Sequence, residues 1–179
     1  HNAIILGQPL KTKPYFLDAT FGRLQFELFN SMELFIMAHE YGHIYSGHLD
    51  KSNIVLQVKN NIPREIILLN WEMEFEADFI GLQLLLNTFD KDSFFPFCYL
   101  GPELFFTFLD LSDRVNNLNE TGIETRSYGS DTHPSSFERR ERIRNLLKNS
   151  LPKNHYESYE PVSIFLENVL ELLWEKYRG

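Results

Sequence analysis

The stretch His39-Glu40-Tyr41-Gly42-His43 constrains this chain more than any other part of its sequence. It lies in a run from about Leu24 to Leu49 in which apolar residues recur with the helical period. Two histidines four residues apart on a helix point to one side and lie roughly 6 Å apart along its axis, so both imidazoles can bind one metal ion. Glu40 stands beside them, at the spacing typical of a general base that acts on water at a zinc ion.

Helical geometry also indicates that the two histidines face the protein interior. At about 100° per residue, Leu28, Phe35 and Ile36 lie within about 60° of His39. A buried polar group without a partner destabilises a fold by roughly 1–3 kcal/mol, and a shared metal ion would satisfy both imidazoles. The alternative is an ordinary core helix without a metal. Gly42 has two interpretations as well, because a small residue lets either a neighbouring helix or a substrate approach closely.

A second helix, predicted from about Glu65 to Leu86, carries in its middle, at 72–78, four acids that divide between two faces. Glu74 and Asp78 lie about 40° apart on an apolar face, whereas Glu72 and Glu76 lie nearly opposite and are expected to be solvated. Carboxylates on an apolar face need a counter-charge or a metal ion. We therefore expect Glu74 to be the third metal ligand. We expect Asp78 to accept a hydrogen bond from the ring nitrogen of a ligating histidine that does not bind the metal. The alternative is that both acids pair with arginine or lysine elsewhere.

Two further histidines stand near these motifs. His48 lacks the spacing of a third histidine ligand, and we expect it to face solvent or to cap the end of the first helix. His133 precedes a proline, which favours extended backbone, and such a fixed histidine could donate to an oxyanion. Ser135 and Glu138 form a capping box that begins a helix. The arginines in 139–144 are predicted to form a solvated basic face or to pair with the acid stripe of the second helix.

The rest of the chain predicts a small sheet and further helices. The β-branched runs 3–6 and 53–59, each bounded by turn-forming residues, are predicted strands. A helix is expected from about 102 to 115, and an amphipathic helix that packs on the core from about 161 to 178. These patterns predict a single domain over residues 1–179 with its core at about 24–149. Its fold class is α+β and predominantly helical.

The amino-acid composition limits the classes of partner that this protein is expected to bind. The net charge of −8, with no basic block before Arg139, argues against nucleic acid. The longest apolar stretch, Phe94 to Leu111, is interrupted by two prolines and a glycine and does not predict a membrane span. One cysteine, Cys98, permits no intramolecular disulfide, which is typical of a reducing compartment. We expect a cytoplasmic protein, with membrane association only through a segment outside this sequence. The oligomeric state is not indicated.

Three motifs follow one another in a recognisable order: His39-Glu-Tyr-Gly-His43, Glu74-Phe-Glu-Ala-Asp78 and Thr132-His-Pro-Ser-Ser-Phe-Glu-Arg139. Together they resemble the gluzincin metallopeptidases of the CAAX-prenyl-protease and HtpX type, over roughly Phe35 to Ile143. That group pairs H-E-x-x-H with a later E-x-x-A-D helix and an H-P-x-x-x-x-R segment. The resemblance implies a zincin-like domain that holds Zn²⁺. By position it also implies these roles: His39, His43 and Glu74 as zinc ligands, Glu40 as base, Asp78 orienting a histidine, His133 contacting the oxyanion, and Arg139 supporting that loop or the substrate.

From these motifs we expect a zinc-dependent metalloendopeptidase that acts on a protein or peptide substrate. Many relatives of that type carry several transmembrane helices, and this sequence predicts none. Compact cytosolic proteases of the ImmA/IrrE type and phage-exclusion proteases, which cut regulatory or host proteins, are the alternative. A non-catalytic zinc-binding interaction module is the alternative from a different class, although a binding module has no need of Glu40.

Overall fold

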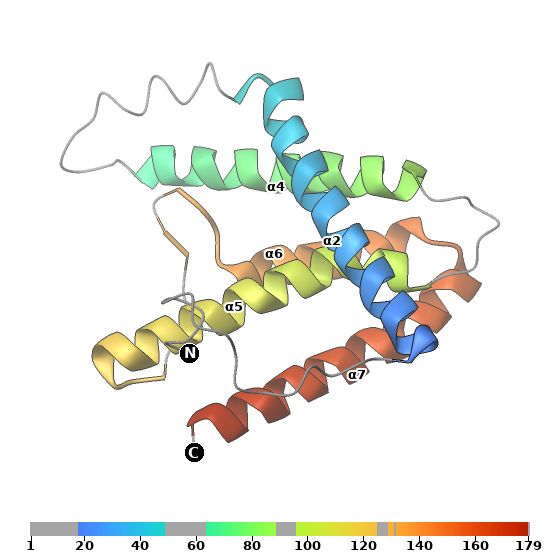
Figure 1. Ribbon diagram of the computed structural model, residues 1–179. Coiled ribbons are helices and arrows are strands. Elements are labelled where there is room, and N and C mark those ends of the chain that lie inside the picture. The colour runs from blue at the N-terminus through green and yellow to red at the C-terminus, as the bar shows by residue number, and fades with distance from the viewer. Residues whose placement is uncertain (1–17, 49–63, 89–95, 125–128, 131, 179) are drawn as a thin grey trace, which may run out of the picture.

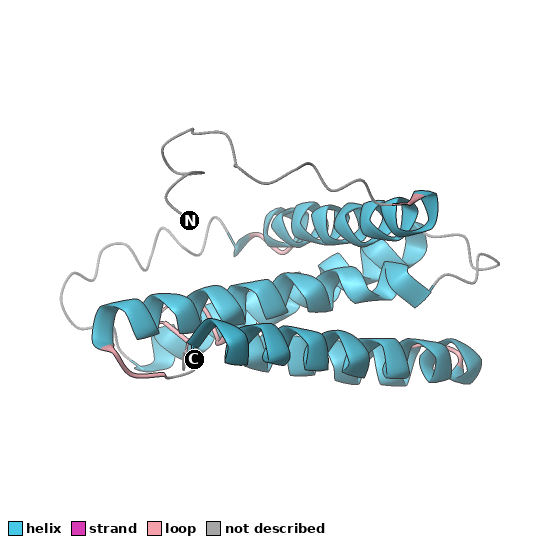
Figure 2. Ribbon diagram, turned by 60° about the horizontal axis from the view of Figure 1, so that its bottom comes forward, coloured by secondary structure: helices cyan, strands magenta, loops and turns pink. Residues whose placement is uncertain are grey.

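The computed structural model describes residues 18–48, 64–88, 96–124, 129–130 and 132–178. Within these ranges the chain is helical and contains no strand (Figure 2). The helices are α2 (Ala19–Tyr45), α4 (Arg64–Thr88), the 3₁₀ helix η1 (Pro96–Tyr99), α5 (Leu100–Thr121), α6 (Ser136–Ser150) and α7 (Lys153–Arg178). The prediction of a predominantly helical chain is confirmed. The predicted α+β class with a small sheet is not supported, and the two predicted strands, 3–6 and 53–59, lie outside the described residues.

The helix α2 crosses α4 and also packs on α5 (Figure 1). The helix α5 also contacts α6 and α7, and α4 contacts α6. Each of the five α-helices contributes to one apolar core, because each carries a buried stripe at helical spacing. Burial of one such side chain stabilises the fold by roughly 1.5–3 kcal/mol. The core residues are Phe35, Leu82, Leu85, Leu100, Phe106, Ile143, Leu147 and Tyr159.

The crossing of α2 and α4 is close because each helix places a glycine at the contact. A Cβ atom on Gly42 would lie 3.0 Å from the Cα and carbonyl oxygen of Ala77, and one on Gly81 would lie 3.0 Å from the backbone nitrogen of His39. Both separations are tighter than ordinary van der Waals contact, which begins at 3.4 Å. The helix-packing interpretation of Gly42 is therefore confirmed. This contact sets the distance between the helix of the two histidines and the helix of Glu74.

The helix ends show which local signals decided the boundaries. Asp18 caps α2, accepting hydrogen bonds from the backbone nitrogens of Thr20 and Phe21 at 2.9 and 3.1 Å. The capping residue Ser135 begins α6 at Ser136, as predicted. The prediction that the last helix begins near residue 161 is wrong, because α7 begins at Lys153 and carries Pro161 in its interior.

A buried carboxylate explains how α7 continues across that proline. Glu103 on α5 is almost fully buried and accepts hydrogen bonds from the hydroxyls of Tyr159 and Ser163 at 2.5 and 2.7 Å. These residues stand on either side of Pro161, so both turns of α7 are held against α5. Tertiary contacts thus outweigh the local tendency of an interior proline to end a helix.

The predicted solvated basic face is also wrong for most of its members. Arg140 is buried and donates to Glu167 at 3.0 Å, while Arg144 donates to Glu103 at 2.5 Å. Arg142 is exposed, with its guanidinium 3.6 Å from the ring centre of Phe75. Arg140 and Arg144 pair with these acids because α5 and α7 bring the carboxylates of Glu103 and Glu167 to α6. In the described part of the chain, no helix combines the length and apolarity that crossing a membrane requires.

Candidate metal centre

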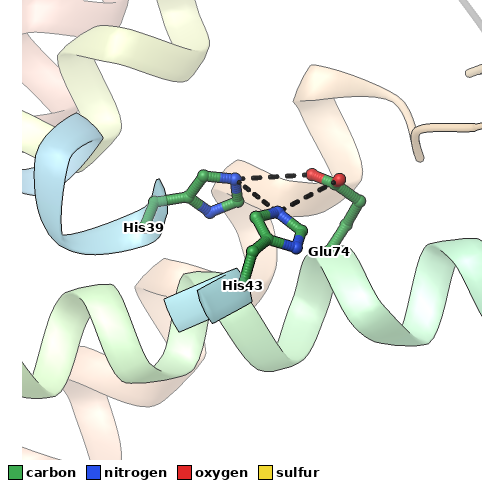
Figure 3. Close-up of side chains that lie close together, drawn as sticks. All are labelled: His39, His43 and Glu74. Carbon is green, nitrogen blue, oxygen red and sulfur yellow. Dashed lines mark hydrogen bonds and ion pairs between the residues drawn. The ribbon is translucent and has the colours of Figure 1, made fainter. Parts of the chain in front are cut away.

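Three side chains from two helices converge at the crossing of α2 and α4 (Figure 3). The Nε2 atoms of His39 and His43 lie 3.1 Å apart. Each faces one carboxylate oxygen of Glu74, at 3.6 Å from His39 Nε2 and 3.4 Å from His43 Nε2. One ligand atom from each residue lies within 4.8 Å of the others, with His39 and Glu74 buried and His43 half-buried. This cluster could bind a metal ion.

The separations fit a tetrahedral metal ion. With metal–ligand bonds of about 2.0–2.2 Å, typical of histidine and carboxylate ligands, two ligand atoms of a tetrahedron lie about 3.3–3.6 Å apart. The two Nε2 atoms lie 3.1 Å apart, and each lies close to this range from one oxygen of Glu74, His43 at 3.4 Å from Oε1 and His39 at 3.6 Å from Oε2. Oε2 of Glu74 is buried and accepts no hydrogen bond from the described residues, although Arg139 Nη1 lies 3.0 Å away at an ion-pair distance. That oxygen is therefore paired with the guanidinium by charge alone, without a hydrogen-bond donor in place in the described part of the chain.

Asp78 and Arg139 enclose the inner side of this cluster. Oδ1 of Asp78 lies 3.0 Å from Nδ1 of His39, as the helical face of Asp78 predicted. The buried guanidinium of Arg139 donates from Nε to Asp78 Oδ2 at 2.8 Å and from Nη2 to Asp78 Oδ1 at 2.7 Å. Two carboxylates and one guanidinium leave one net negative charge when both imidazoles are neutral. Pairing with arginine thus accounts for only part of the buried negative charge, and a cation would offset the rest.

Contacts within the cluster shift the pKa values of two of its ligands, His43 and Glu74. The hydrogen bond to Glu74 raises the pKa of His43, outweighing the effect of burial. For Glu74, burial acts to raise the pKa, but the hydrogen bond from His43 and the charge of Arg139 together lower it. The carboxylate is therefore ionised at neutral pH, whereas protons compete with a metal ion for His43.

The two predicted catalytic residues, Glu40 and His133, are both exposed. Glu40 is exposed on α2, and its charge contributes to raising the pKa of His43. The His133 side chain is 58% exposed and its Nε2 lies 3.4 Å from Oε1 of Glu74. Neither belongs to the set of three convergent ligand atoms. The loop of His133 is tied to α4, because Trp71 Nε1 donates to the carbonyl oxygen of Ser130 at 2.9 Å.

His48 is the residue whose placement the sequence interpretation missed. It was expected to face solvent or cap the helix, but it is only 3% exposed. Its Nδ1 lies 3.0 Å from Nδ1 of His43, and its Nε2 lies 3.1 Å from Oε2 of Glu76. Glu76 is consequently not simply solvated, although its side chain is 54% exposed. The missed signal is Gly47, whose φ of +65° turns the chain back at the end of α2.

Comparisons of the chain with family models, with curated proteins and with solved structures find no match. The choice of a function therefore depends on the chemistry of the site itself.

Proposed function

We propose that this protein is a zinc-dependent endopeptidase that hydrolyses a peptide bond within a protein substrate. The observation that carries the proposal is the convergence of His39, His43 and Glu74 at separations of 3.1–3.6 Å. Two histidines and one glutamate are the ligand set of hydrolytic zinc sites, which keep a fourth position for water or substrate, whereas structural zinc sites are closed by four protein ligands. The order of the three sequence motifs supports a gluzincin of the CAAX-prenyl-protease and HtpX type.

When bound, zinc supplies a Lewis acid that polarises a carbonyl oxygen and lowers the pKa of nearby water. Glu40 then accepts the proton of the attacking water and returns it to the leaving amine. Its exposure on α2 supports this role, because a base that exchanges protons with water and substrate must be accessible from the open side. One carboxylate performs both transfers, since it is protonated after the first.

His133 donates from Nε2 to the oxyanion that develops on the scissile carbonyl. Thr132 supports this role, because its hydroxyl lies 2.7 Å from Nδ1 of His133 and can hold the ring with Nε2 directed at the site. On the inner side, Asp78 accepts the Nδ1 proton of His39, and Arg139 holds that carboxylate in place by donating to it. A protein chain is the expected substrate because the general base, the oxyanion donor and the ligand set are those of amide hydrolysis.

The test is the substitution Glu40→Gln, with Glu33→Gln as its matched control. Glu33 is an exposed glutamate of the same helix, so both changes remove one negative charge from α2. We expect Glu40→Gln to bind one zinc ion per chain, as the wild type does, and to lose cleavage of casein or of a peptide library. Glu33→Gln should retain both properties.

Two outcomes would contradict the proposal. Cleavage by Glu40→Gln at the wild-type rate would refute the base assignment. Stoichiometric zinc in the wild type, without cleavage of any protein or peptide in the library, would instead indicate a non-catalytic zinc-binding module.

A further inference from the structure

Behind His43, on the side away from Glu74, lies a second histidine backed by a carboxylate. Nδ1 of His48 is 3.0 Å from Nδ1 of His43, and Nε2 of His48 is 3.1 Å from Oε2 of Glu76. We infer that His48 and Glu76 are positioning residues that fix the tautomer of His43 in which Nε2 is free to bind the metal. The inference depends on the proposed metal site but not on the proposed hydrolysis.

The positions of the protons follow from the chemistry of the metal ion, His43, His48 and Glu76. A neutral imidazole that binds a metal through Nε2 carries its proton on Nδ1 and must donate it. For His43 the acceptor within reach is Nδ1 of His48, so His48 carries its own proton on Nε2. That proton points to Glu76, whose carboxylate only accepts. The opposite arrangement would place a proton on Nε2 of His43 and prevent it from binding a metal.

Burial makes this arrangement a requirement for His48 as well. Because His48 is only 3% exposed, both of its nitrogens need partners inside the protein, and His43 and Glu76 are at hydrogen-bond distance. An apolar residue would fill the same space without this need. A histidine at this buried position is therefore explained by its two polar contacts and not by packing.

The local structure holds Glu76 in the required orientation. Gly47, at φ +65°, reverses the chain after α2, so that His48 returns to the side of His43. Ser46 Oγ donates to Oε1 of Glu76 at 2.9 Å, while the other oxygen, Oε2, faces His48. Both oxygens of the carboxylate thus have separate partners from the turn that ends α2. The Nδ1 of His43 thus reaches a carboxylate through His48, whereas Nδ1 of His39 contacts the carboxylate of Asp78 directly, at 3.0 Å.

The test compares two replacements of His48 in the full chain loaded with Co²⁺. The side-chain carbonyl of His48→Gln can still accept from His43, whereas His48→Leu fills the site without an acceptor. In the cobalt protein, each histidine bound through Nε2 has an exchangeable Nδ1 proton whose NMR signal is shifted far from the other resonances. We expect two such signals in the wild type and in His48→Gln. In His48→Leu one signal should be lost to exchange with water, and zinc affinity, measured by chelator competition, should fall about 10- to 100-fold.

A second pair of variants tests the carboxylate of Glu76 without changing a buried residue. Glu76→Ala removes the acceptor of the His48 Nε2 proton and should accelerate exchange of one of the two signals, and Glu72→Ala, an exposed change on the same helix, should leave both as in the wild type. Two unchanged signals with wild-type zinc affinity in His48→Leu would overturn the inference, as would unchanged exchange in Glu76→Ala if His48→Leu fails to fold. A wild-type chain that binds neither Co²⁺ nor Zn²⁺ would overturn the metal site and this inference together. Metal binding with the expected signals but without proteolysis would contradict only the proposed hydrolysis.

Discussion

Substituting Gly42 by alanine should separate α2 from α4 and weaken metal binding without removing any ligand. The added Cβ would lie 3.0 Å from the Cα and carbonyl oxygen of Ala77, both backbone atoms that cannot rotate away. Ordinary contact begins at 3.4 Å, so the helices must move apart by a few tenths of an ångström. Separations of 3.4 and 3.6 Å between the imidazole nitrogens and Glu74 would then exceed those of a tetrahedral site, which tolerates changes of about 0.2 Å in its bonds.

Two opposing terms determine the effect of this change on stability. Alanine favours a helix interior by roughly 1 kcal/mol relative to glycine. Overpacking of a tight contact destabilises a fold by roughly 1–3 kcal/mol. We therefore expect Gly42→Ala to lower the free energy of unfolding by about 0–2 kcal/mol and to lower zinc affinity more clearly than stability.

The matched control is Gly22→Ala on the same helix, where an added Cβ meets no atom within 4 Å. It should leave zinc affinity unchanged and raise Tm by roughly 2–4 °C for each kcal/mol gained, given a chain of this size. Tm is measured by circular dichroism on metal-free protein, and zinc affinity by competition with a chromogenic chelator. Wild-type zinc affinity in Gly42→Ala would refute the argument that the glycine contact sets the ligand separations.

Three further perturbations test other parts of the site and core. Arg139→Met should lower the free energy of unfolding in urea by about 3–5 kcal/mol, because it leaves the buried carboxylates of Glu74 and Asp78 without their cation. A loss below about 1 kcal/mol would contradict this stabilising role of the guanidinium. The pKa of His43 lies above its usual 6.5, so zinc affinity should begin to fall, as the pH is lowered, already above pH 6.5. In the metal-free protein, the stability that protonated His43 provides is fully present below pH 6.5 and is lost as the pH rises through the raised pKa. A zinc affinity that does not change between pH 8 and pH 5.5 would contradict this assignment. Burial raises the pKa of Cys98 to about 12, so a thiol-specific chromogenic disulfide should react with it only after urea unfolding, and rapid reaction of the folded chain would show that the α2–η1 contact opens.

Features within one helix were predictable from the sequence, because the 3.6-residue period fixes which side chains share a face. The exposed Glu72 and buried Glu74 of α4 followed from that rule, as did the burial of His39 on α2. The start of α6 was predictable for a similar reason, since the Ser135 hydroxyl accepts from the backbone nitrogen of Glu138, three residues away.

Features that join two helices were not predictable in this way. The sequence does not indicate that Arg140 is buried or that Arg144 is half-buried, because their partners Glu167 and Glu103 belong to other helices. The interior position of Pro161 has the same origin, since contacts to α5 hold α7 across the proline.

The amino-acid sequence by itself determined that two imidazoles share one side of α2 and that Glu74 and Asp78 share one side of α4. Only the tertiary structure decided that these two faces meet with ligand separations of 3.1–3.6 Å, and that His48 stands behind His43. The physical reason is that backbone periodicity acts over a few residues, whereas the distance between helices depends on which side chains, here Gly42 and Gly81, lie at their crossing.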